Sequence, residues 1–204
     1  MLSYQTIAPH TLELLTQLMG EPLLSETRLV GGTALALLYG HRNSVDLDFF
    51  GKLHDDKLAV RSCLEKIGKI SVLKETESIR VYDLDGVKID FVDYSRYCWL
   101  DGPVVEDNLR LASPKDIAAM KINAIEGRGT RKDFIDIYYL LQHYSLPEIL
   151  DFYKEKYPEY SIFRALMCLS YFEDAEKQVM PRMFTSDSWE EMKIYILKEV
   201  EAIQ

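Results

Sequence analysis

Residues 31–50, GGTALALLYGHRNSVDLDFF, decide the fold of this chain. The stretch opens with a glycine pair and a threonine, continues into strong helix formers, and ends with Asp46 and Asp48 in front of two phenylalanines. A short apolar run precedes it. The pattern therefore predicts a strand, a glycine turn, a helix over 33–39 and a second strand over 45–50.

The spacing of Asp46 and Asp48 places both carboxylates on one face of a strand, because successive side chains alternate between faces. Two carboxylates pointing the same way offer the hard oxygen ligands that suit Mg²⁺, with water and substrate phosphate completing its shell. Such a pair also commonly caps the turn after a strand, so the pair alone does not decide between the two roles.

Gly31, Gly32 and Thr33 stand where the predicted strand passes into the helix. Backbone amides at such a turn, with the positive end of the helix dipole behind them, can cradle a phosphate. A glycine pair by itself is weak evidence for this function. A phosphate cradle beside a carboxylate pair indicates chemistry on a nucleoside triphosphate.

The combined pattern resembles the signature of the nucleotidyltransferase fold, a Gly-Gly or Gly-Ser turn followed by Asp-x-Asp. GGTALAL with HRNSVDLDFF resembles in particular the AbiEii/AbiGii family of nucleotidyltransferase toxins, from bacterial type IV toxin-antitoxin and phage-defence systems. Thr33 stands where many relatives carry serine, and it retains the hydroxyl. The resemblance implies Mg²⁺-dependent transfer of a nucleoside monophosphate from an NTP to an acceptor hydroxyl, such as a tRNA 3′ end or another RNA. It also implies two Mg²⁺ ions, with Mn²⁺ as the alternative, and a cognate antitoxin partner.

A third carboxylate is expected from the hairpin predicted over 79–93, whose turn is Asp85-Gly86. In its second strand Asp90 lies on the polar face, and a solvent-exposed role is the ordinary interpretation. The resemblance instead implies that Asp90 binds metal with Asp46 and Asp48 and assists deprotonation of the acceptor. Asp93 lies on the opposite face and is the weaker candidate.

Two further helix starts follow. Ser113 precedes Asp116 by three residues, and Thr130 precedes Asp133 by three, both in capping-box arrangement. They predict two helices that meet near residues 127–129. Asp116 is interpreted as a partner of the helix dipole.

The same block resembles the later motifs of the family, a lysine on one helix and a basic-Asp pair on the next, which match Lys121, Lys132 and Asp133. A lysine can bind the triphosphate as a point charge, and Lys121 is assigned that function. Asp133 either orients Lys121 or contacts the base and ribose. Lys132 is either a nucleotide ligand or an ordinary solvated residue.

Arg42 and Ser44, in the loop before the aspartates, are the remaining nucleotide-binding candidates. Arg42 either clamps a phosphate or pairs internally with Asp46 or Asp48. His41 is interpreted as a packing residue or a support for the site.

The coarse pattern is α+β, a nucleotidyltransferase-like mixed sheet with flanking helices followed by a helical C-terminal region. Residues 1–110 are expected to form the catalytic core, and residues 111–204 a helical region that completes the nucleotide site. Further helices are predicted at 8–19, 55–67, 114–126, 131–143, 147–156, 161–174 and 187–202, and further strands at 27–30 and 70–76.

The chain has 204 residues, a formal net charge of −9 and three cysteines without a C-x-x-C motif. This cysteine usage predicts a cytoplasmic protein, and neither a secretory signal nor a membrane span is expected. The charge argues against a general nucleic-acid coat, although residues 110–133 hold six basic against three acidic side chains.

Other functions fit the same residues. A transferase of this fold could modify an antibiotic or a protein hydroxyl, and a non-catalytic relative could bind nucleotide without releasing pyrophosphate. The acidic residues could also serve only as caps and for solubility. The sequence specifies neither the preferred nucleotide nor the oligomeric state.

Overall fold

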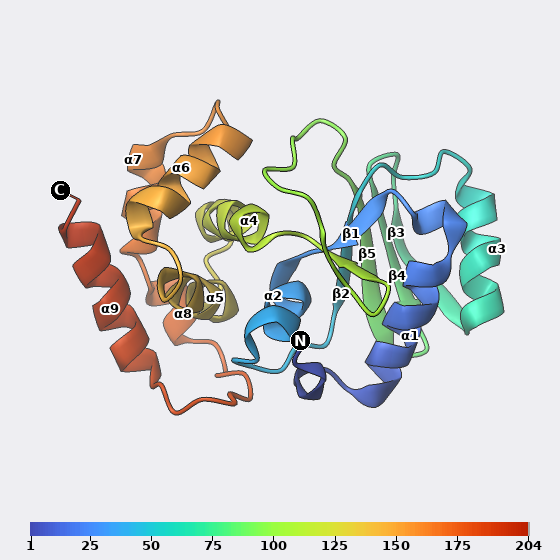
Figure 1. The fold of residues 1–204 in the computed structure, drawn as a ribbon, viewed down its shortest axis with the longest axis horizontal. Coiled ribbons are helices and arrows are strands. Elements are labelled where there is room, and N and C mark those ends of the chain that lie inside the picture. The colour runs from blue at the N-terminus through green and yellow to red at the C-terminus, as the bar shows by residue number, and fades with distance from the viewer. Residues whose placement is uncertain (204) are drawn as a thin grey trace. The chain divides into compact units, whose positions relative to one another are not determined.

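The computed structural model describes residues 1–203, which form two compact units (Figure 1). The sheet unit comprises Met1–Gly40, Ser44–Cys98 and Gly102–Ala112. The helical unit comprises the chain from Ser113 onward together with two short segments from earlier in the sequence, His41–Asn43 and Trp99–Asp101.

The sheet unit contains a seven-stranded mixed sheet with the order β3-β4-β5-β2-β1-β7-β6. β2 pairs with β5, and β1 with β7, in parallel, whereas the other neighbours are antiparallel. The mixed sheet was predicted, but the two three-residue strands β6 and β7 were not. The strands are β1 (Thr27–Leu29), β2 (Leu47–Gly51), β3 (Ile70–Glu75), β4 (Ile79–Leu84), β5 (Val87–Asp93), β6 (Val104–Glu106) and β7 (Leu109–Leu111).

Three α-helices belong to the sheet unit. Their bounds are α1 (Pro9–Gly20), α2 (Gly31–Tyr39) and α3 (Lys57–Ile67), with short 3₁₀ turns at Tyr4–Thr6 and Pro22–Leu24. In Figure 1, α1 and α3 lie on one side of the sheet and α2 on the other. The helix expected over 33–39 begins two residues earlier, so the glycine pair forms the first turn of α2 instead of a loop before it.

The hairpin between β4 and β5 was predicted from Asp85-Gly86, and the structure confirms it. Both turn residues have positive φ, 49° and 84°, as a two-residue turn of the primed type requires. Leu84 pairs with Val87 across the turn, and this pairing fixes the register of β5. Every second residue of β5 is buried, which leaves Lys88 and Asp90 on the opposite face.

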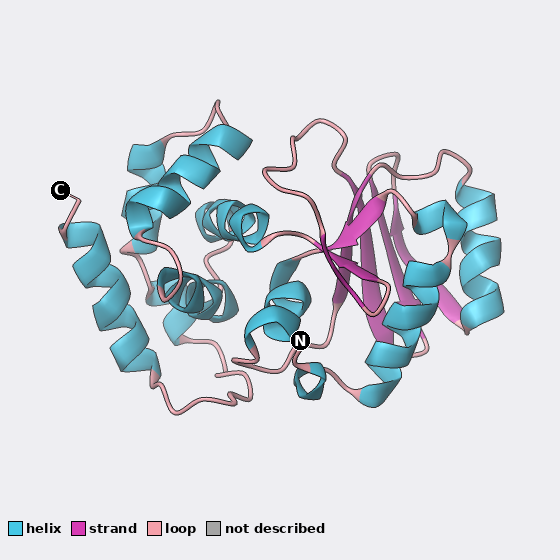
Figure 2. Ribbon diagram, in the orientation of Figure 1, coloured by secondary structure: helices cyan, strands magenta, loops and turns pink. Residues whose placement is uncertain are grey.

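The helical unit contains helices and loops but no strand within residues 113–203 (Figure 2). The helix predicted over 161–174 is two helices, Ile162–Leu169 and Glu173–Glu176, and Ser170 is the C-cap of the first. No helix in the described part of the chain combines the length and hydropathy that crossing a membrane requires. The helices are α4 (Pro114–Gly127), α5 (Arg131–Leu141), α6 (Leu146–Lys156), α7 (Ile162–Leu169), α8 (Glu173–Glu176) and α9 (Trp189–Glu201).

Asp116, in the first turn of α4, has hydrogen-bond and ion-pair partners within the helical unit. Its backbone amide donates to the Ser113 hydroxyl, which confirms the predicted cap. Its carboxylate accepts a hydrogen bond from Lys156 Nζ at 2.7 Å and another from the Leu100 amide, and both members of the ion pair are fully buried. The carboxylate therefore compensates a buried ammonium, which is more than the dipole partnership expected from the sequence.

Candidate active site

Asp48 and Asp90 are register partners on the adjacent parallel strands β2 and β5. Neighbouring strands lie about 4.8 Å apart, and partners in parallel register project to the same face, so the two carboxylates are neighbours. Asp46 lies just before β2, which begins at Leu47, so the strand expected over 45–50 starts too early.

The first residue of α2 lies against this pair. Gly31 has φ +67°, and a Cβ added there would lie 2.7 Å from Asp48 Oδ2. Only glycine accommodates both the backbone conformation and the close carboxylate. The glycine turn and the aspartate are therefore in contact, as the sequence predicted. Gly32 follows in the same helical turn and is half-buried.

Thr33 has a buried side chain that connects this turn to the aspartate segment. Its hydroxyl donates to the backbone carbonyl of Asp46 and lies 2.8 Å from Ser44 Oγ. Both hydroxyls thus bond within the sheet unit. Their geometry indicates that these two side chains position the Asp46 backbone, whereas the sequence made Thr33 and Ser44 candidates for binding the nucleotide.

Lys88 supplies the positive charge of this cluster. It lies two residues before Asp90 on the same face of β5, with Nζ 2.8 Å from Asp90 Oδ2. Partial burial alone would lower the pKa of Lys88, but the hydrogen bond to Asp90 and the attraction of Asp90, Asp48 and Asp46 outweigh it, and the pKa is raised. The ammonium is therefore close enough to all three predicted metal ligands to interact with each.

The donor set suits a divalent cation. Asp90 Oδ1 is buried and has no hydrogen-bond partner in the described chain, and the other available donors are carboxylate oxygens. Within residues 1–203, no three His, Cys, Asp or Glu side chains are gathered closely enough to form a ready metal-binding group. In this arrangement the Lys88 ammonium is the cation that contacts Asp90.

A second set of charged side chains is buried in the helical unit and centres on Asp136 of α5, which is fully buried. Arg42 donates to its two oxygens from Nε and Nη2, both at 2.8 Å. Lys121 Nζ lies 2.6 Å from Oδ2, and His41 Nε2 lies 2.9 Å from Oδ1. The internal partner of Arg42 is therefore Asp136, and the expected pairing with Asp46 or Asp48 is wrong.

Asp133 is the second carboxylate of this set. It accepts hydrogen bonds from Lys121 Nζ at 3.0 Å and from Nε and Nη2 of Arg128 at 2.9 and 3.0 Å. Of the two roles considered for Asp133, its contacts correspond to orienting Lys121. Lys132 is exposed, although it precedes Asp133 in the chain.

Electrostatics follow from these contacts. Burial opposes ionisation of Asp133 and Asp136, but the neighbouring cations outweigh it and hold both carboxyl pKa values below their usual range. Burial likewise opposes the charge on Lys121, yet Asp136 and Asp133 raise its pKa. Arg42 and Lys121 are buried with the two carboxylates, and Arg128, whose side chain is 64% exposed, adds a third positive charge from the surface.

His41 behaves differently from these charged groups. Burial lowers the pKa of His41 even though the contact with Asp136 opposes the shift. The ring is therefore neutral near pH 7, and Nε2–H donates to Asp136. Nδ1 is buried without a hydrogen-bond partner in the described residues, as fits its unprotonated state.

Sequence reasoning missed the function of Asp136 and Arg128 as members of this set. One signal was available, because Asp136 follows Asp133 by three residues and so shares its helical face. The apolar residues Ile135 and Ile137 flank Asp136 in the chain, and a carboxylate in that environment requires partners.

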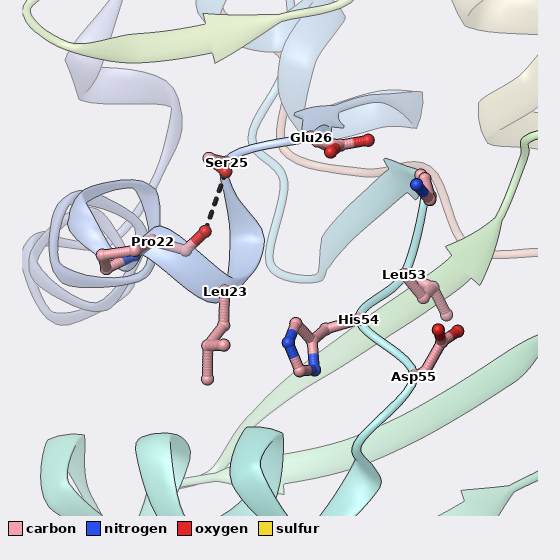
Figure 3. A pocket seen from close by; sticks show the side chains of 8 residues that line it. Pro22, Leu23, Ser25, Glu26, Leu53, His54 and Asp55 are labelled. Carbon is pink, nitrogen blue, oxygen red and sulfur yellow. Dashed lines mark hydrogen bonds between the residues drawn. The ribbon is translucent and has the colours of Figure 1, made fainter.

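A separate surface pocket of about 190 Å³ lies in the sheet unit (Figure 3). None of the predicted site residues lines it, and its Ser25 hydroxyl bonds the Pro22 carbonyl within the wall. The lining residues are Pro22, Leu23, Ser25, Glu26, Lys52, Leu53, His54 and Asp55. This pocket is therefore not part of the candidate site formed by Gly31, Asp48 and Asp90.

Comparison with known proteins gives the family. The model described as "Nucleotidyl transferase AbiEii toxin, Type IV TA system" matches residues 13–202. The chain belongs to the AbiEii family. This confirms the resemblance inferred from residues 31–50, and the description of the family names nucleotidyl transferase toxins of type IV toxin-antitoxin systems.

Relatives of this AbiEii protein match nearly full-length. An uncharacterised protein of Aquifex aeolicus is 32% identical over 195 residues, covering 93% of each chain. A structure from H. pylori, described as a candidate nucleotidyltransferase, has a TM-score of 0.60 at 19% identity and covers 96% of this chain and 95% of its own. The nucleotidyltransferase toxin MenT4 of Mycobacterium tuberculosis has a TM-score of 0.52 at 13% identity, with coverage of 95% and 83%. The predicted nucleotidyltransferase fold is thereby confirmed.

Proposed function

We propose that this AbiEii protein transfers a nucleoside monophosphate from an NTP to an acceptor hydroxyl and releases pyrophosphate, with Mg²⁺ held by Asp46, Asp48 and Asp90. The observation that carries the proposal is the register pairing of Asp48 with Asp90 beside Gly31. This pairing supports a function in which metal-binding carboxylates and the backbone amides of the glycine turn bind the same triphosphate.

The residues of the sheet unit have distinct functions in this proposal. The first amides of α2, at Gly31, Gly32 and Thr33, have no carbonyl partner inside the helix and donate to phosphate oxygens. Asp90, whose Oδ1 is unsatisfied, accepts the proton of the attacking hydroxyl. A bound divalent ion would supply charge neutralisation at the transferring phosphoryl group.

We further propose that Lys121 binds a phosphate of the NTP. An ammonium has three donors, and the contacts with Asp133 and Asp136 use two of them. Lys132 is proposed as an additional exposed contact. For Arg42 and Ser44 we propose support of neighbouring residues instead of direct contact, because their polar atoms already bond within the protein.

The proposed acceptor is RNA, such as a tRNA 3′ end, and the proposed partner is a cognate antitoxin. Both are supported by membership of a type IV toxin-antitoxin family. Among the basic side chains between residues 110 and 133, Lys132 is exposed and would offer charge to a phosphate backbone, whereas Lys121 and Arg128 are already paired with Asp133.

The test is transfer of label from each α-labelled NTP to total RNA, with and without Mg²⁺. The Asp48→Asn variant keeps the shape of the side chain but removes its charge, and Asp151→Asn on the exposed face of α6 is the matched control. We expect the first to lose transfer and the second to retain it. Full activity of Asp48→Asn would contradict the metal assignment, and transfer to an antibiotic or protein instead of RNA would contradict the acceptor.

A further inference from the structure

Lys88 lies beside the proposed metal ligands, and the proposed function assigns it no role. It alternates with buried residues on β5, and its side chain is 45% exposed although Nζ contacts Asp90. Its ammonium interacts with Asp90, Asp48 and Asp46 together. These are the three carboxylates proposed to hold the divalent ion.

The positive charge of Lys88 opposes the binding of a divalent cation by the three carboxylates. Three carboxylates and one ammonium leave two negative charges uncompensated. A divalent cation that approached Asp90 would meet the Lys88 charge a few ångströms away, and like charges at that distance repel strongly. The hydrogen bond at 2.8 Å also occupies Asp90 Oδ2, an oxygen that the ion would use.

We propose that Lys88 is an internal counter-ion of the acidic cluster, which occupies the place of the cation in the metal-free protein and withdraws when a divalent ion binds. The inference rests on the proposed function, because it assumes that Asp46, Asp48 and Asp90 bind metal. Lys88 thereby sets the metal concentration at which the site becomes loaded. It is a positioning residue and takes no part in the chemistry.

The side chain of Lys88 is suited to this movement. A lysine carries a compact charge on a flexible stem, and nearly half of this one already contacts solvent. Lys121 provides the contrast, since its side chain is only 6% exposed and two carboxylates hold its ammonium. Lys88 can leave Asp90 for water without breaking any packed core.

The experiment measures Mn²⁺ binding to the full-length protein by calorimetry and by the paramagnetic resonance signal of free Mn²⁺, without nucleotide. Lys88→Met removes the charge and keeps an unbranched side chain of similar length, and Lys88→Arg retains the charge. Lys74→Met, at an exposed position on β3, is the matched control. Melting in EDTA and in Mn²⁺ is recorded in parallel.

We expect Lys88→Met to bind Mn²⁺ about tenfold more tightly, equivalent to about 1.4 kcal/mol. Lys88→Arg and Lys74→Met should stay within about threefold of the wild type. Without metal, Lys88→Met should melt at a lower temperature than the wild type, because three carboxylates then lack a counter-ion, and Mn²⁺ should reverse the difference.

Two contrary results have different meanings. If Asp48→Asn abolishes Mn²⁺ binding but Lys88→Met binds as the wild type does, or more weakly, the counter-ion inference is overturned while the metal site stands. If Asp48→Asn binds Mn²⁺ as tightly as the wild type, both the metal site of the proposed function and this inference are overturned.

Discussion

Asp136 accepts two hydrogen bonds from the Arg42 guanidinium, although the two residues are 94 positions apart in the chain. The bidentate pair attaches the segment His41–Asn43 to the helical unit, and the same carboxylate also contacts Lys121. Since the side chains of Asp136, Arg42 and Lys121 are at most 6% exposed, each charge depends on the others for compensation. The buried set of charges therefore acts as one unit.

Replacing Asp136 with Asn should destabilise the protein by about 3 kcal/mol, because Arg42 and Lys121 would remain buried with too little negative charge. The free energy of unfolding in urea, followed by circular dichroism, measures the effect. Asp151→Asn removes an exposed carboxylate from α6 and should change the free energy by less than about 0.5 kcal/mol. Equal stability of the two variants would contradict a cooperative buried set.

His41 should make stability depend on pH. Its folded pKa lies below the ordinary value of 6.5, so the unfolded chain binds the proton more readily. The contribution of His41 to the free energy of unfolding is complete above the pKa of the unfolded state, and it is lost as the pH falls through the pKa of the folded state. The free energy of unfolding changes there by at most about 1.4 kcal/mol per pH unit. Asp133 and Asp136, whose pKa values are depressed, lose their contributions only below the unfolded carboxyl value of 3.8.

The measurement is the free energy of unfolding between pH 7 and pH 5, where the histidine effect is separate from that of the carboxyls. His41→Gln can still donate to Asp136 but cannot take up the proton, so its stability should fall less steeply than that of the wild type. His10→Gln, at an exposed position of α1, should keep the wild-type slope. A steep fall in His41→Gln would show that another group is responsible.

Gly31→Ala should reduce nucleotidyl transfer while leaving a folded protein. The positive φ costs a non-glycine residue about 1–2 kcal/mol, and the new Cβ would push Asp48 Oδ2 from its place, 2.7 Å away. A misplacement of about 1 Å at a reacting centre costs about a hundredfold in rate. Gly20→Ala is the control, since a Cβ there meets no atom within 4 Å. Wild-type transfer rates in Gly31→Ala would rule out close contact between this turn and the carboxylate.

The local elements were predictable because local rules determine them. The hairpin followed from Asp85-Gly86, which adopts positive φ at both residues, and the start of α4 followed from Ser113 and Asp116. Strands β6 and β7 have three residues each, too few to display an alternating pattern, and unlike the equally short β1 they do not adjoin the glycine turn that indicated a strand.

The buried charges could not be predicted in the same way. An arginine in a loop is ordinarily solvated, and the partner of Arg42 lies on a distant helix, so no local pattern records the pair. The pairing of Asp48 with Asp90 likewise depends on a contact between parallel strands whose paired residues are 42 positions apart in the chain, and only the resemblance to a known family indicated it. The sequence shows which residues carry charge, but its local patterns do not predict which of these residues are buried together.

Thr33 provides the test of whether its hydroxyl contacts phosphate or positions the aspartates. It donates to the Asp46 carbonyl and adjoins Ser44, so we expect Thr33→Val to lower kcat by about tenfold through displacement of Asp46, with little change in KM for the NTP. Thr33→Ser retains the hydroxyl and should keep at least half of the activity. A hydroxyl that bound phosphate equally in ground and transition states would instead raise KM in Thr33→Val. Steady-state kinetics of both variants distinguish the two roles, and a rise in KM alone would show that Thr33 is a nucleotide ligand.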